Sequence, residues 1–423
     1  MQIEILPSKL HGTAHAPASK SEAHRRMICA GLADGCTKLH GFMESEDMAA
    51  TWACLKALGA GLSLEGDTLT IQGTEGKKRI CPVLDCGESG STLRFFVPIA
   101  MAKCGGGIFR MHGRLGQRPM DVYRDLFVPQ GTGWRMGIGA DGAAELHVTG
   151  HLQSGAYVLP GNVSSQFVSG LLFALPLLEG ESTLTVKPPV ESAGYIQMTL
   201  RALADSGIQV YETAPYTWMI PGKQRYCTED GTLTGDYSQA AVLLCAAALG
   251  QDVAVDGLSA DSIQGDRAVL DHLRALGAEI EEKDGCIRVA KPACHSAELD
   301  MSGCPDIAPM LALVCQLMPG ESRLKGCGRL RLKECDRLTT TKKILRQLGG
   351  DALVAGDDLV LKGVTKLHGG VTVDAKEDHR MVMLTVMAAL LCEEPVTLTG
   401  AESVNKSWPE FLHVITGLGG KIS

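Results

Sequence analysis

Strongly apolar segments recur along the chain at intervals of roughly 70 to 74 residues, and a short polar cluster precedes each of them. Segments such as 167–178 and 381–392 are too apolar to be exposed on any face, so the pattern predicts buried helices. The polar clusters begin at Ser19, Glu88, Ser164, Asp236, Pro305 and Asp378. A helix start carries unpaired N–H groups and partial positive charge, so converging helix starts would form a binding site for anions.

More amphipathic helices form a second series with the same period. Each is predicted to end near a glycine, the residue that best adopts the positive φ needed just past a helix end. These glycines are Gly59, Gly131, Gly207, Gly277, Gly349 and Gly419. The segments that follow, such as 208–211 and 278–281, alternate in polarity and predict strands. Each repeat is therefore interpreted as a compact α/β unit of two helices and several short strands, and the chain holds six repeats.

The repeats divide most simply into two domains of three. Residues 1 to about 14, from Gln2 onward, resemble a strand, which needs a partner and can complete the last repeat. We therefore predict one domain at 17–228 and another at 1–14 plus 235–423, with hinges at Pro17-Ala18 and 226–235. Two linkers with a site between the domains predict closure on a ligand.

Charge favours a small anionic ligand over a nucleic acid. The formal net charge is −8, whereas a nucleic-acid-binding surface is basic. Basic residues nevertheless gather at the predicted helix starts and at Arg118, Lys333, Arg337 and Lys406. Any one of them alone would more often be an exposed surface cation. Their recurrence in four repeats of an acidic protein favours a focused cationic cleft.

Other patterns predict a cytoplasmic protein without a metal or cofactor. The longest apolar stretches fall short of the roughly 20 residues that a membrane helix needs, and residues 1–6 do not resemble a signal peptide. Fifteen cysteines are scattered without Cys-x-x-Cys spacing, which favours reduced thiols over disulfides or zinc. The twelve histidines show no metal-ligand spacing. We expect a monomer with no nucleic-acid or membrane partner, and a solvated loop at 75–79.

Two clusters carry the most specific chemistry. In the first, Ser19 is placed to cap a helix, Lys20 lies just inside it and Arg25 follows one turn later, which suits phosphate or carboxylate binding. The glycine-rich phosphate loop of NTPases is absent from the sequence. In the second, residues 85–94, Gly90 would let a ligand approach the backbone closely. An ordinary loop and helix cap explains this second cluster equally well when it is taken alone.

Taken together and in order, these motifs closely resemble the family of 5-enolpyruvylshikimate-3-phosphate (EPSP) synthases, also called 3-phosphoshikimate 1-carboxyvinyltransferases. The matching positions cover essentially the whole chain: Ser19-Lys20-Ser21 with Arg25, Gly90 with Arg94, Arg118-Pro119, Ser164-Ser165-Gln166-Phe167, Asp236, Asp306, Lys333 to Leu338, Asp378 to Met381, and Lys406. The resemblance implies an inside-out α/β barrel fold, with two domains of three α/β repeats and an active site in the cleft between them.

The resemblance also implies a reaction. The enolpyruvyl (1-carboxyvinyl) group of phosphoenolpyruvate would pass to the 5-hydroxyl of shikimate 3-phosphate, on the route to chorismate and the aromatic amino acids. The implied phosphoenolpyruvate ligands are Lys20, Gly90, Arg118, Gln166, Arg337, Arg380 and Lys406. The implied shikimate 3-phosphate ligands are Lys20, Ser21, Arg25, Ser164, Ser165, Gln166, Ser192, Tyr195, Asp306 and Lys333.

An addition followed by an elimination needs an acid and a base, and the family assigns these roles to positions that match Asp306 and Glu334, with Lys20 assisting. Each carboxylate also has a simpler interpretation. Asp306 would cap a helix, and Glu334 would form an ion pair with Arg337 or Lys333.

Some positions differ from the commonest family pattern, namely Ala18, Glu88, Ser91 and Phe95. They surround the implied phosphoenolpyruvate pocket and leave every implied catalytic charge in place. Two alternative functions stay open: a transferase of the same fold acting on UDP-N-acetylglucosamine, and a non-catalytic anion-binding relative. The first is marked in its family by a reactive cysteine on a mobile loop, and the corresponding region 110–118 contains no cysteine here.

Overall fold

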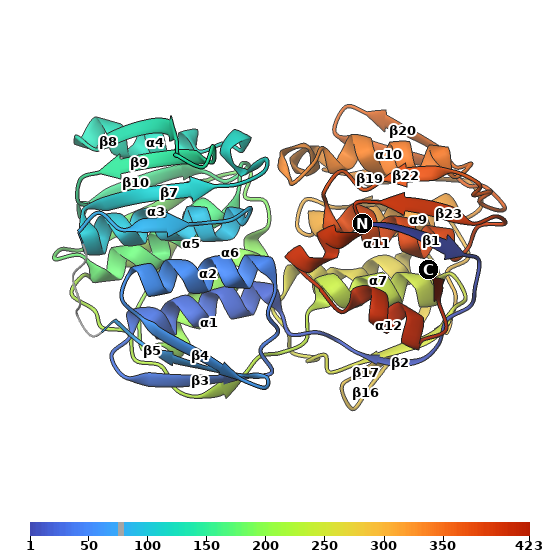
Figure 1. Cartoon of the computed structure of the whole chain (residues 1–423), viewed down its shortest axis with the longest axis horizontal. Coiled ribbons are helices and arrows are strands. Elements are labelled where there is room, and N and C mark those ends of the chain that lie inside the picture. The colour runs from blue at the N-terminus through green and yellow to red at the C-terminus, as the bar shows by residue number, and fades with distance from the viewer. Residues whose placement is uncertain (75–79) are drawn as a thin grey trace. The chain divides into compact units, whose positions relative to one another are not determined.

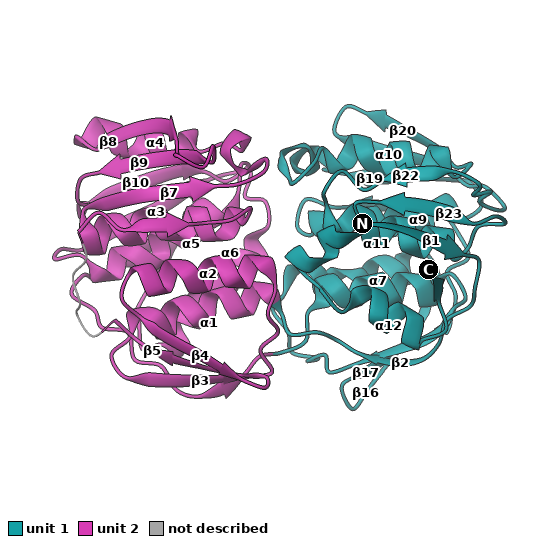
Figure 2. Cartoon of the chain, in the orientation of Figure 1, with its two compact units in different colours: residues 1–19, 234–423 teal, residues 20–233 magenta. Residues whose placement is uncertain are grey.

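Two compact units make up the chain in the computed structural model, which describes residues 1–74 and 80–423. Unit 1 contains Met1–Ser19 and Thr234–Ser423, and unit 2 contains Lys20–Leu233 (Figure 2). The predicted solvated loop at 75–79 lies outside the described residues. The predicted hinges and their motion stay predictions.

The described residues form six sheets of four strands, and all six share one pattern of strand directions. Figure 1 labels many of these strands. In each sheet an outer strand runs parallel to its neighbour, and the next two pairings are antiparallel. Mixed sheets with this repeated order confirm the predicted α/β class and the count of six. The sheets are open, and the described residues contain no closed barrel of strands.

The sheets of unit 2 are built from the middle of the chain. Their strands, in spatial order, are β14 (Gly231–Thr232), β3 (Cys36–His40), β5 (Thr68–Gln72) and β4 (Gly61–Glu65); β6 (Val83–Asp85), β7 (Gly106–Met111), β9 (Ala144–Thr149) and β8 (Gly133–Ile138); and β10 (Ala156–Pro160), β11 (Ser182–Lys187), β13 (Thr217–Ile220) and β12 (Tyr211–Ala214).

The sheets of unit 1 combine the start of the chain with its second half. Their strands, in spatial order, are β2 (His11–His15), β15 (Asp252–Asp256), β17 (Cys286–Lys291) and β16 (Glu279–Lys283); β18 (Glu298–Asp300), β19 (Glu321–Lys325), β21 (Asp358–Lys362) and β20 (Asp351–Ala355); and β22 (Thr372–Asp374), β23 (Val396–Thr399), β1 (Gln2–Leu6) and β24 (Lys421–Ile422).

The N-terminal segment supplies two strands to two different sheets, where the sequence predicted one strand. β1 pairs with β23 and β24, whereas β2 pairs with β15. Pro7 has no N–H to offer a strand ladder, which favours a break just after β1. The backbone N–H of Leu10 then donates to the side chain of Gln251 over 2.6 Å instead of to a strand.

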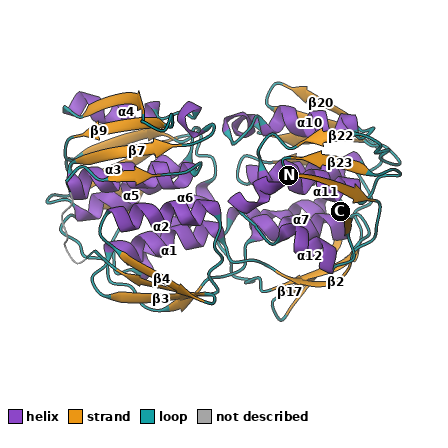
Figure 3. Cartoon of the chain, in the orientation of Figure 1, coloured by secondary structure: helices purple, strands orange, loops and turns teal. Residues whose placement is uncertain are grey.

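The apolar helices are α1 (Lys20–Leu32), α3 (Gly90–Cys104), α5 (Ser165–Ala174), α7 (Tyr237–Ala248), α9 (Ala308–Gln316) and α11 (His379–Ala389). Each follows the outer parallel strand of a sheet. Every residue of α11 is buried, which confirms the prediction made from its unbroken apolar run. Figure 3 shows α1, α2 and α5 of unit 2 between the sheet of β3 and β4 and the sheet of β7 and β9.

The amphipathic helices are α2 (Glu46–Ala57), α4 (Asp121–Phe127), α6 (Ala193–Asp205), α8 (Val269–Ala275), α10 (Arg337–Gln347) and α12 (Phe411–Gly417). The six predicted glycines follow their ends with φ between 74° and 103°, which confirms the predicted left-handed positions. The strand predicted at 278–281 is found as β16, but the one predicted at 208–211 begins only at Tyr211. The N–H of Ile208 bonds back to Leu203 instead, closing the helix end.

None of the helices in the described ranges combines the length and apolar character that crossing a lipid bilayer requires.

Candidate active site

The predicted site residues of unit 2 lie at or beside the starts of four helices, and we call them the unit 2 cluster. Its members are Lys20, Ser21, Arg25, Gly90, Arg118, Ser164, Ser165, Gln166, Ser192 and Tyr195. Most start α1, α3, α5 or α6, or precede one of them, so their backbone N–H groups add to the positive potential of the side chains.

Lys20, the first residue of α1, forms an ion pair with a residue that the sequence did not single out. Its Nζ lies 2.7 Å from Oδ2 of Asp47, in the first turn of α2, and the two side chains are only 20% and 15% exposed. Acidic residues commonly occupy a first helical turn, so the position of Asp47 alone gave no functional signal.

Arg25 is buried and held entirely by neutral groups. Its Nε donates to Oγ1 of Thr199 (2.8 Å), Nη1 to the carbonyl of Ser21 (2.7 Å) and Nη2 to the carbonyl of Tyr195 (2.9 Å). The guanidinium also faces the rings of Phe95 and Tyr195. Burial lowers the pKa of Arg25 to about 10, so it stays charged at neutral pH. Within the described ranges no carboxylate neutralises it, which leaves its charge for a bound anion.

Gly90 lies directly against two guanidinium groups. A Cβ at this position would be 2.7 Å from Nη1 of Arg118 and 2.9 Å from Nη1 of Arg94. Arg94 is buried, donates to Oε1 of Gln166 over 2.8 Å and lies over the ring of Phe167. Only glycine leaves room for both guanidinium groups at the start of α3.

The start of α5 is connected to the start of α3. Gln166 donates from Nε2 to Oγ of Ser91 over 2.8 Å, while its Oε1 accepts from Arg94. Ser164 caps α5 by accepting from the N–H of Gln166, and Ser165 is buried beside it. The network brings Ser91, one of the departures from the family pattern, into direct contact with a predicted ligand residue.

Ser192 has an unusual backbone conformation. It is 2% exposed and precedes α6 with φ +54°, in the left-handed region that residues other than glycine rarely adopt. Backbone strain of this kind is concentrated at functional sites. Tyr195 lies one turn further on, where its N–H donates to the carbonyl of Ser192.

Two predicted carboxylates of unit 1 bind one buried arginine, and we call the predicted site residues of this unit the unit 1 cluster. Its members are Asp306, Lys333, Glu334, Arg337, Arg380 and Lys406. Arg337 is 2% exposed, and three of its nitrogens donate hydrogen bonds to three different carboxylates. Nη1 donates to Asp306 (2.7 Å), Nη2 to Glu334 (2.6 Å) and Nε to Asp378 (2.7 Å). The two carboxylates predicted as acid and base are therefore held by one guanidinium.

Asp306 stays ionised despite its burial. Burial would raise its pKa, but Lys333, 2.8 Å away, and Arg337 outweigh that effect, so the pKa of Asp306 lies well below its usual range. Burial in turn lowers the pKa of Lys333, with Asp306 opposing the change. Burial also opposes the charge of Arg337, but Asp378 and Glu334 outweigh it and raise the pKa of that guanidinium.

Asp378 organises the other side of Arg337. It is fully buried, caps α11 by accepting from the N–H of Arg380 (2.9 Å) and accepts from the thiol of Cys335 (3.4 Å). The side chain of Arg380 reaches the carbonyl of Ser238 over 2.7 Å, and Lys406 reaches the carbonyl of Glu377 over 2.8 Å. Both cations are thus positioned partly by neutral backbone oxygens.

Of the two simpler interpretations, the structure supports the ion pair of Glu334 and not the helix cap of Asp306. Asp306 lies inside the short helical turn Pro305–Ile307 and bonds to cations, so its side chain is not the cap of that turn. Glu334 does form the ion pair with Arg337 that was its alternative. That ion pair also orients the carboxylate, so it is compatible with an acid–base role.

The sequence interpretation missed three kinds of contact. It missed Asp47 beside Lys20, Asp378 as a third partner of Arg337, and the aromatic faces of Phe95 and Phe167. Asp378 had a local signal, since it precedes an apolar helix at a capping position. The other contacts join segments far apart in sequence and have no local signal.

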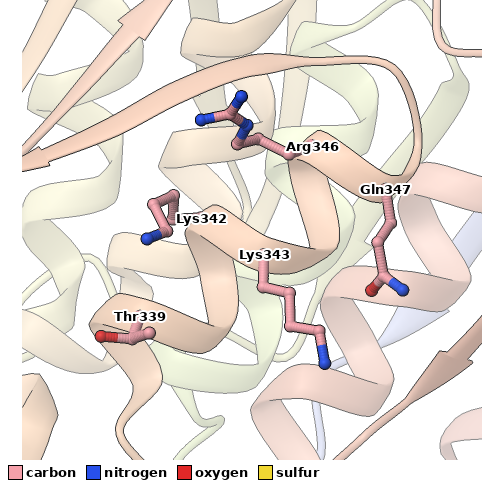
Figure 4. Close-up of a pocket in the computed structure, with 5 residues that line it drawn as sticks. All are labelled: Thr339, Lys342, Lys343, Arg346 and Gln347. Atoms are coloured by element: carbon pink, nitrogen blue, oxygen red, sulfur yellow. The ribbon is translucent and has the colours of Figure 1, made fainter.

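A pocket of about 450 Å³ lies on the outer face of α10 and contains none of the predicted residues. It is lined by Thr339, Lys342, Lys343, Arg346 and Gln347 (Figure 4). Arg337 begins the same helix but is buried. Metal-binding geometry is likewise absent from the described residues, in which no three His, Cys, Asp or Glu side chains are grouped to hold an ion.

Comparison with known proteins gives consistent matches along the whole chain. The family model of EPSP synthase (3-phosphoshikimate 1-carboxyvinyltransferase) matches residues 6–415. The 3-phosphoshikimate 1-carboxyvinyltransferase of Clostridium beijerinckii is 40% identical, with 99% of this chain and 97% of that protein covered.

Solved structures show the same fold. An EPSP synthase from Acinetobacter baumannii superposes with a TM-score of 0.81 at 24% identity, covering 100% of this chain and 99% of the other. The enolpyruvyl transferase NikO from Streptomyces tendae superposes with a TM-score of 0.80 at 18% identity, covering 100% and 98%.

The pairing of Asp306 predicts a pH-dependent contribution to stability. We expect Asp306→Asn to lower the free energy of unfolding by about 1–3 kcal/mol at pH 7, because Lys333 and Arg337 lose a buried partner. A carboxylate with a lowered folded pKa contributes fully above about pH 5, and its contribution declines progressively as the pH falls from the ordinary aspartate pKa of 3.8 towards the folded pKa. The deficit should therefore shrink towards about pH 3.5, as measured by denaturant unfolding.

Asp357→Asn serves as the control, since that side chain is 72% exposed in the same unit. A deficit of Asp306→Asn that stays constant between the two pH values would contradict the ionised state of Asp306.

Proposed function

The chain belongs to the EPSP synthase family, and we propose that the unit 1 and unit 2 clusters together bind the two substrates of that family's reaction. The chain transfers the enolpyruvyl group of phosphoenolpyruvate to the 5-hydroxyl of shikimate 3-phosphate, a step of the shikimate pathway. The products are 5-enolpyruvylshikimate 3-phosphate and inorganic phosphate. The family and the relatives support this reaction and do not favour a transferase of UDP-N-acetylglucosamine.

Charge balance supports binding by both clusters. Each substrate carries one carboxylate and one phosphate of about −1.5 to −2, so the pair brings roughly five to six negative charges. The unit 1 cluster already neutralises Arg337 with its own carboxylates. Arg25, whose hydrogen-bond acceptors are neutral hydroxyl and carbonyl oxygens, is therefore well suited to receive substrate charge, as are the helix starts around it.

We assign shikimate 3-phosphate mainly to unit 2. Hydroxyl groups donate to phosphate without adding charge, and an arginine can hold a carboxylate with two parallel hydrogen bonds. The proposed ligands are Lys20, Ser21, Arg25, Ser164, Ser165, Gln166, Ser192 and Tyr195 from unit 2, and Asp306 and Lys333 from unit 1. The strained backbone of Ser192 supports a binding role there.

We assign phosphoenolpyruvate to cations of both units. The proposed ligands are Lys20, Gly90, Arg118 and Gln166 from unit 2, and Arg337, Arg380 and Lys406 from unit 1. The close approach of Gly90 to Arg118 supports a tight pocket for a small substrate with two anionic groups.

The carboxylates held by Arg337 carry the proposed chemistry. A proton is delivered to the methylene carbon of phosphoenolpyruvate while the 5-hydroxyl oxygen bonds to its neighbour, giving a tetrahedral adduct. The carbon–oxygen bond to phosphate then breaks, and the methyl group loses a proton to restore the double bond. Asp306 would accept the hydroxyl proton, and Glu334 and Lys20 would deliver a proton to the methylene carbon and later remove one from the methyl group. The observation that carries this assignment is the shared guanidinium, which holds both carboxylates in one place.

We further propose that the chain acts in the cytoplasm as a monomer that needs no cofactor or metal.

Phosphate release from phosphoenolpyruvate tests the function directly. Release is expected with shikimate 3-phosphate and not with UDP-N-acetylglucosamine or without acceptor.

Glu334→Gln should lower kcat by about 10² to 10⁴ while the protein stays folded, because general acid–base catalysis is lost. Turnover near that of the unchanged protein would remove Glu334 from the mechanism, and release only with the sugar nucleotide would overturn the substrate.

Gly90→Ala tests the proposed phosphoenolpyruvate pocket. The new methyl group would overlap the guanidinium of Arg118, which must move away. We expect the KM for phosphoenolpyruvate to rise about tenfold, with little change in the KM for shikimate 3-phosphate. Gly417→Ala is the control, since a Cβ there meets no atom within 4 Å. An unchanged KM for phosphoenolpyruvate would place that substrate elsewhere.

Small-angle X-ray scattering tests the proposed closure of the units on the substrates. The radius of gyration should fall when both substrates are present and not with inorganic phosphate alone. Equal radii under all conditions would count against closure.

A further inference from the structure

A continuous line of side-chain hydrogen bonds joins three helices of unit 2 and includes no proposed substrate ligand. Nδ1 of His24 in α1 lies 2.8 Å from Oγ1 of Thr51 in α2. Oγ1 of Thr51 lies 2.8 Å from Oγ1 of Thr92 in α3, and Oγ1 of Thr92 lies 2.8 Å from Oγ of Ser89. Ser89 is the cap of α3 and directly precedes Gly90. His24, Thr51, Thr92 and Ser89 are all buried, and we call them the relay.

The direction of the protons along the relay follows from its last bond. Thr92 donates its hydroxyl proton to Oγ of Ser89, which also accepts from the N–H of Thr92. A hydroxyl has one proton, so the oxygen of Thr92 must accept from Thr51. Thr51 has then used its own proton and must accept from Nδ1–H of His24. The relay therefore fixes His24 as the tautomer protonated on Nδ1.

The surroundings of His24 agree with this tautomer. Its Nε2 is buried and has no hydrogen-bond partner within the described part of the chain. A proton on Nε2 would create a buried donor without an acceptor, which is rarer and costlier than a bare lone pair next to an aromatic ring. Phe95 packs at right angles to the imidazole with ring centres 6.3 Å apart. Burial, with the charges of Lys20 and Arg25, holds the pKa of His24 well below its usual value, so the ring is neutral.

The relay lies next to Lys20 and Gly90, two residues of the proposed phosphoenolpyruvate pocket. Lys20 and His24 are four residues apart on α1, and Asp47 and Thr51 are four residues apart on α2, so the two pairs form adjacent contacts between the helices. At its other end the relay sets the position of Ser89, and hence of Gly90 against Arg118.

We propose that His24 is a positioning residue for phosphoenolpyruvate, which fixes the start of α3 relative to Lys20 through Thr51 and Thr92. The inference rests on the proposed assignment of Lys20, Gly90 and Arg118 to that substrate. His24 touches neither substrate. It acts through the geometry of the helix starts, and its action requires a donor at the Nδ1 position and not a charge.

The test compares variants that break the relay with one that keeps it. His24→Leu, Thr51→Val and Thr92→Val each remove one link, and each should raise the KM for phosphoenolpyruvate about tenfold, as expected for one lost hydrogen bond in a pocket. The KM for shikimate 3-phosphate should change by less than about twofold. His24→Asn places an amide donor near Nδ1 and should restore the KM to within about threefold. The double variant Thr51→Val/Thr92→Val should raise the KM for phosphoenolpyruvate no more than the worse single variant does, because both substitutions break the same relay.

His40→Leu is the matched control. Its Nδ1 lies 3.1 Å from Oγ1 of Thr68, so the same kind of bond is lost in the same unit without a link to a helix start. Its kinetics should not change.

A second measurement is independent of turnover. Nitrogen-15 NMR of histidine-labelled protein, with His24 assigned by its loss in His24→Asn, should show a protonated Nδ1 and a bare Nε2 at neutral pH. The opposite tautomer would overturn the inference. Unchanged KM values in the relay variants, or equal increases in the KM for both substrates, would also overturn it. Failure of the proposed binding assignment is recognised separately, because Gly90→Ala would then leave the KM for phosphoenolpyruvate unchanged.

Discussion

A single buried guanidinium joins three helix starts of unit 1. Arg337 is taken out of water, and a buried charge is tolerated only when it is paired and fully hydrogen-bonded. Its planar fork meets carboxylates from three separate segments, namely Asp306, Glu334 and Asp378. Those segments lead into α9, α10 and α11, so the pairing of one charge fixes the relative positions of three helix starts. Replacing any one carboxylate would leave the others to reorganise around the same cation.

Unit 2 solves the same problem with neutral groups. Arg25 is buried like Arg337, but hydroxyl and carbonyl oxygens and two aromatic faces surround it. The relay from His24 to Ser89 extends this neutral framework to α3. One unit therefore holds paired charges that suit proton transfer, and the other holds a cation whose charge its own neighbours do not cancel, which suits the binding of anions.

Periodicity predicted the repeated elements well. The burial of a whole helix and the positive φ at Gly207 or Gly349 both depend on residues that are neighbours in the sequence. Contacts between distant segments were not predictable in this way. The strand expected at 208–211 begins later because Ile208 closes the preceding helix. Asp47 and Thr51 contact Lys20 and His24 only because α2 packs on α1. The substrate roles came from resemblance to a family, and together with the domain boundaries they stay predictions.

The strand order has a consequence for biosynthesis. β1 leaves the ribosome long before its partners β23 and β24, which lie roughly 390 to 420 residues further along the chain. At 5 to 20 residues per second, this strand waits about 20 to 80 s for its sheet. Unit 2 is complete in sequence once residue 233 has emerged, long before the last sheet of unit 1 can close. The nascent chain must therefore carry this amphipathic strand unpaired until its partners emerge, which makes the strand a natural target for chaperones.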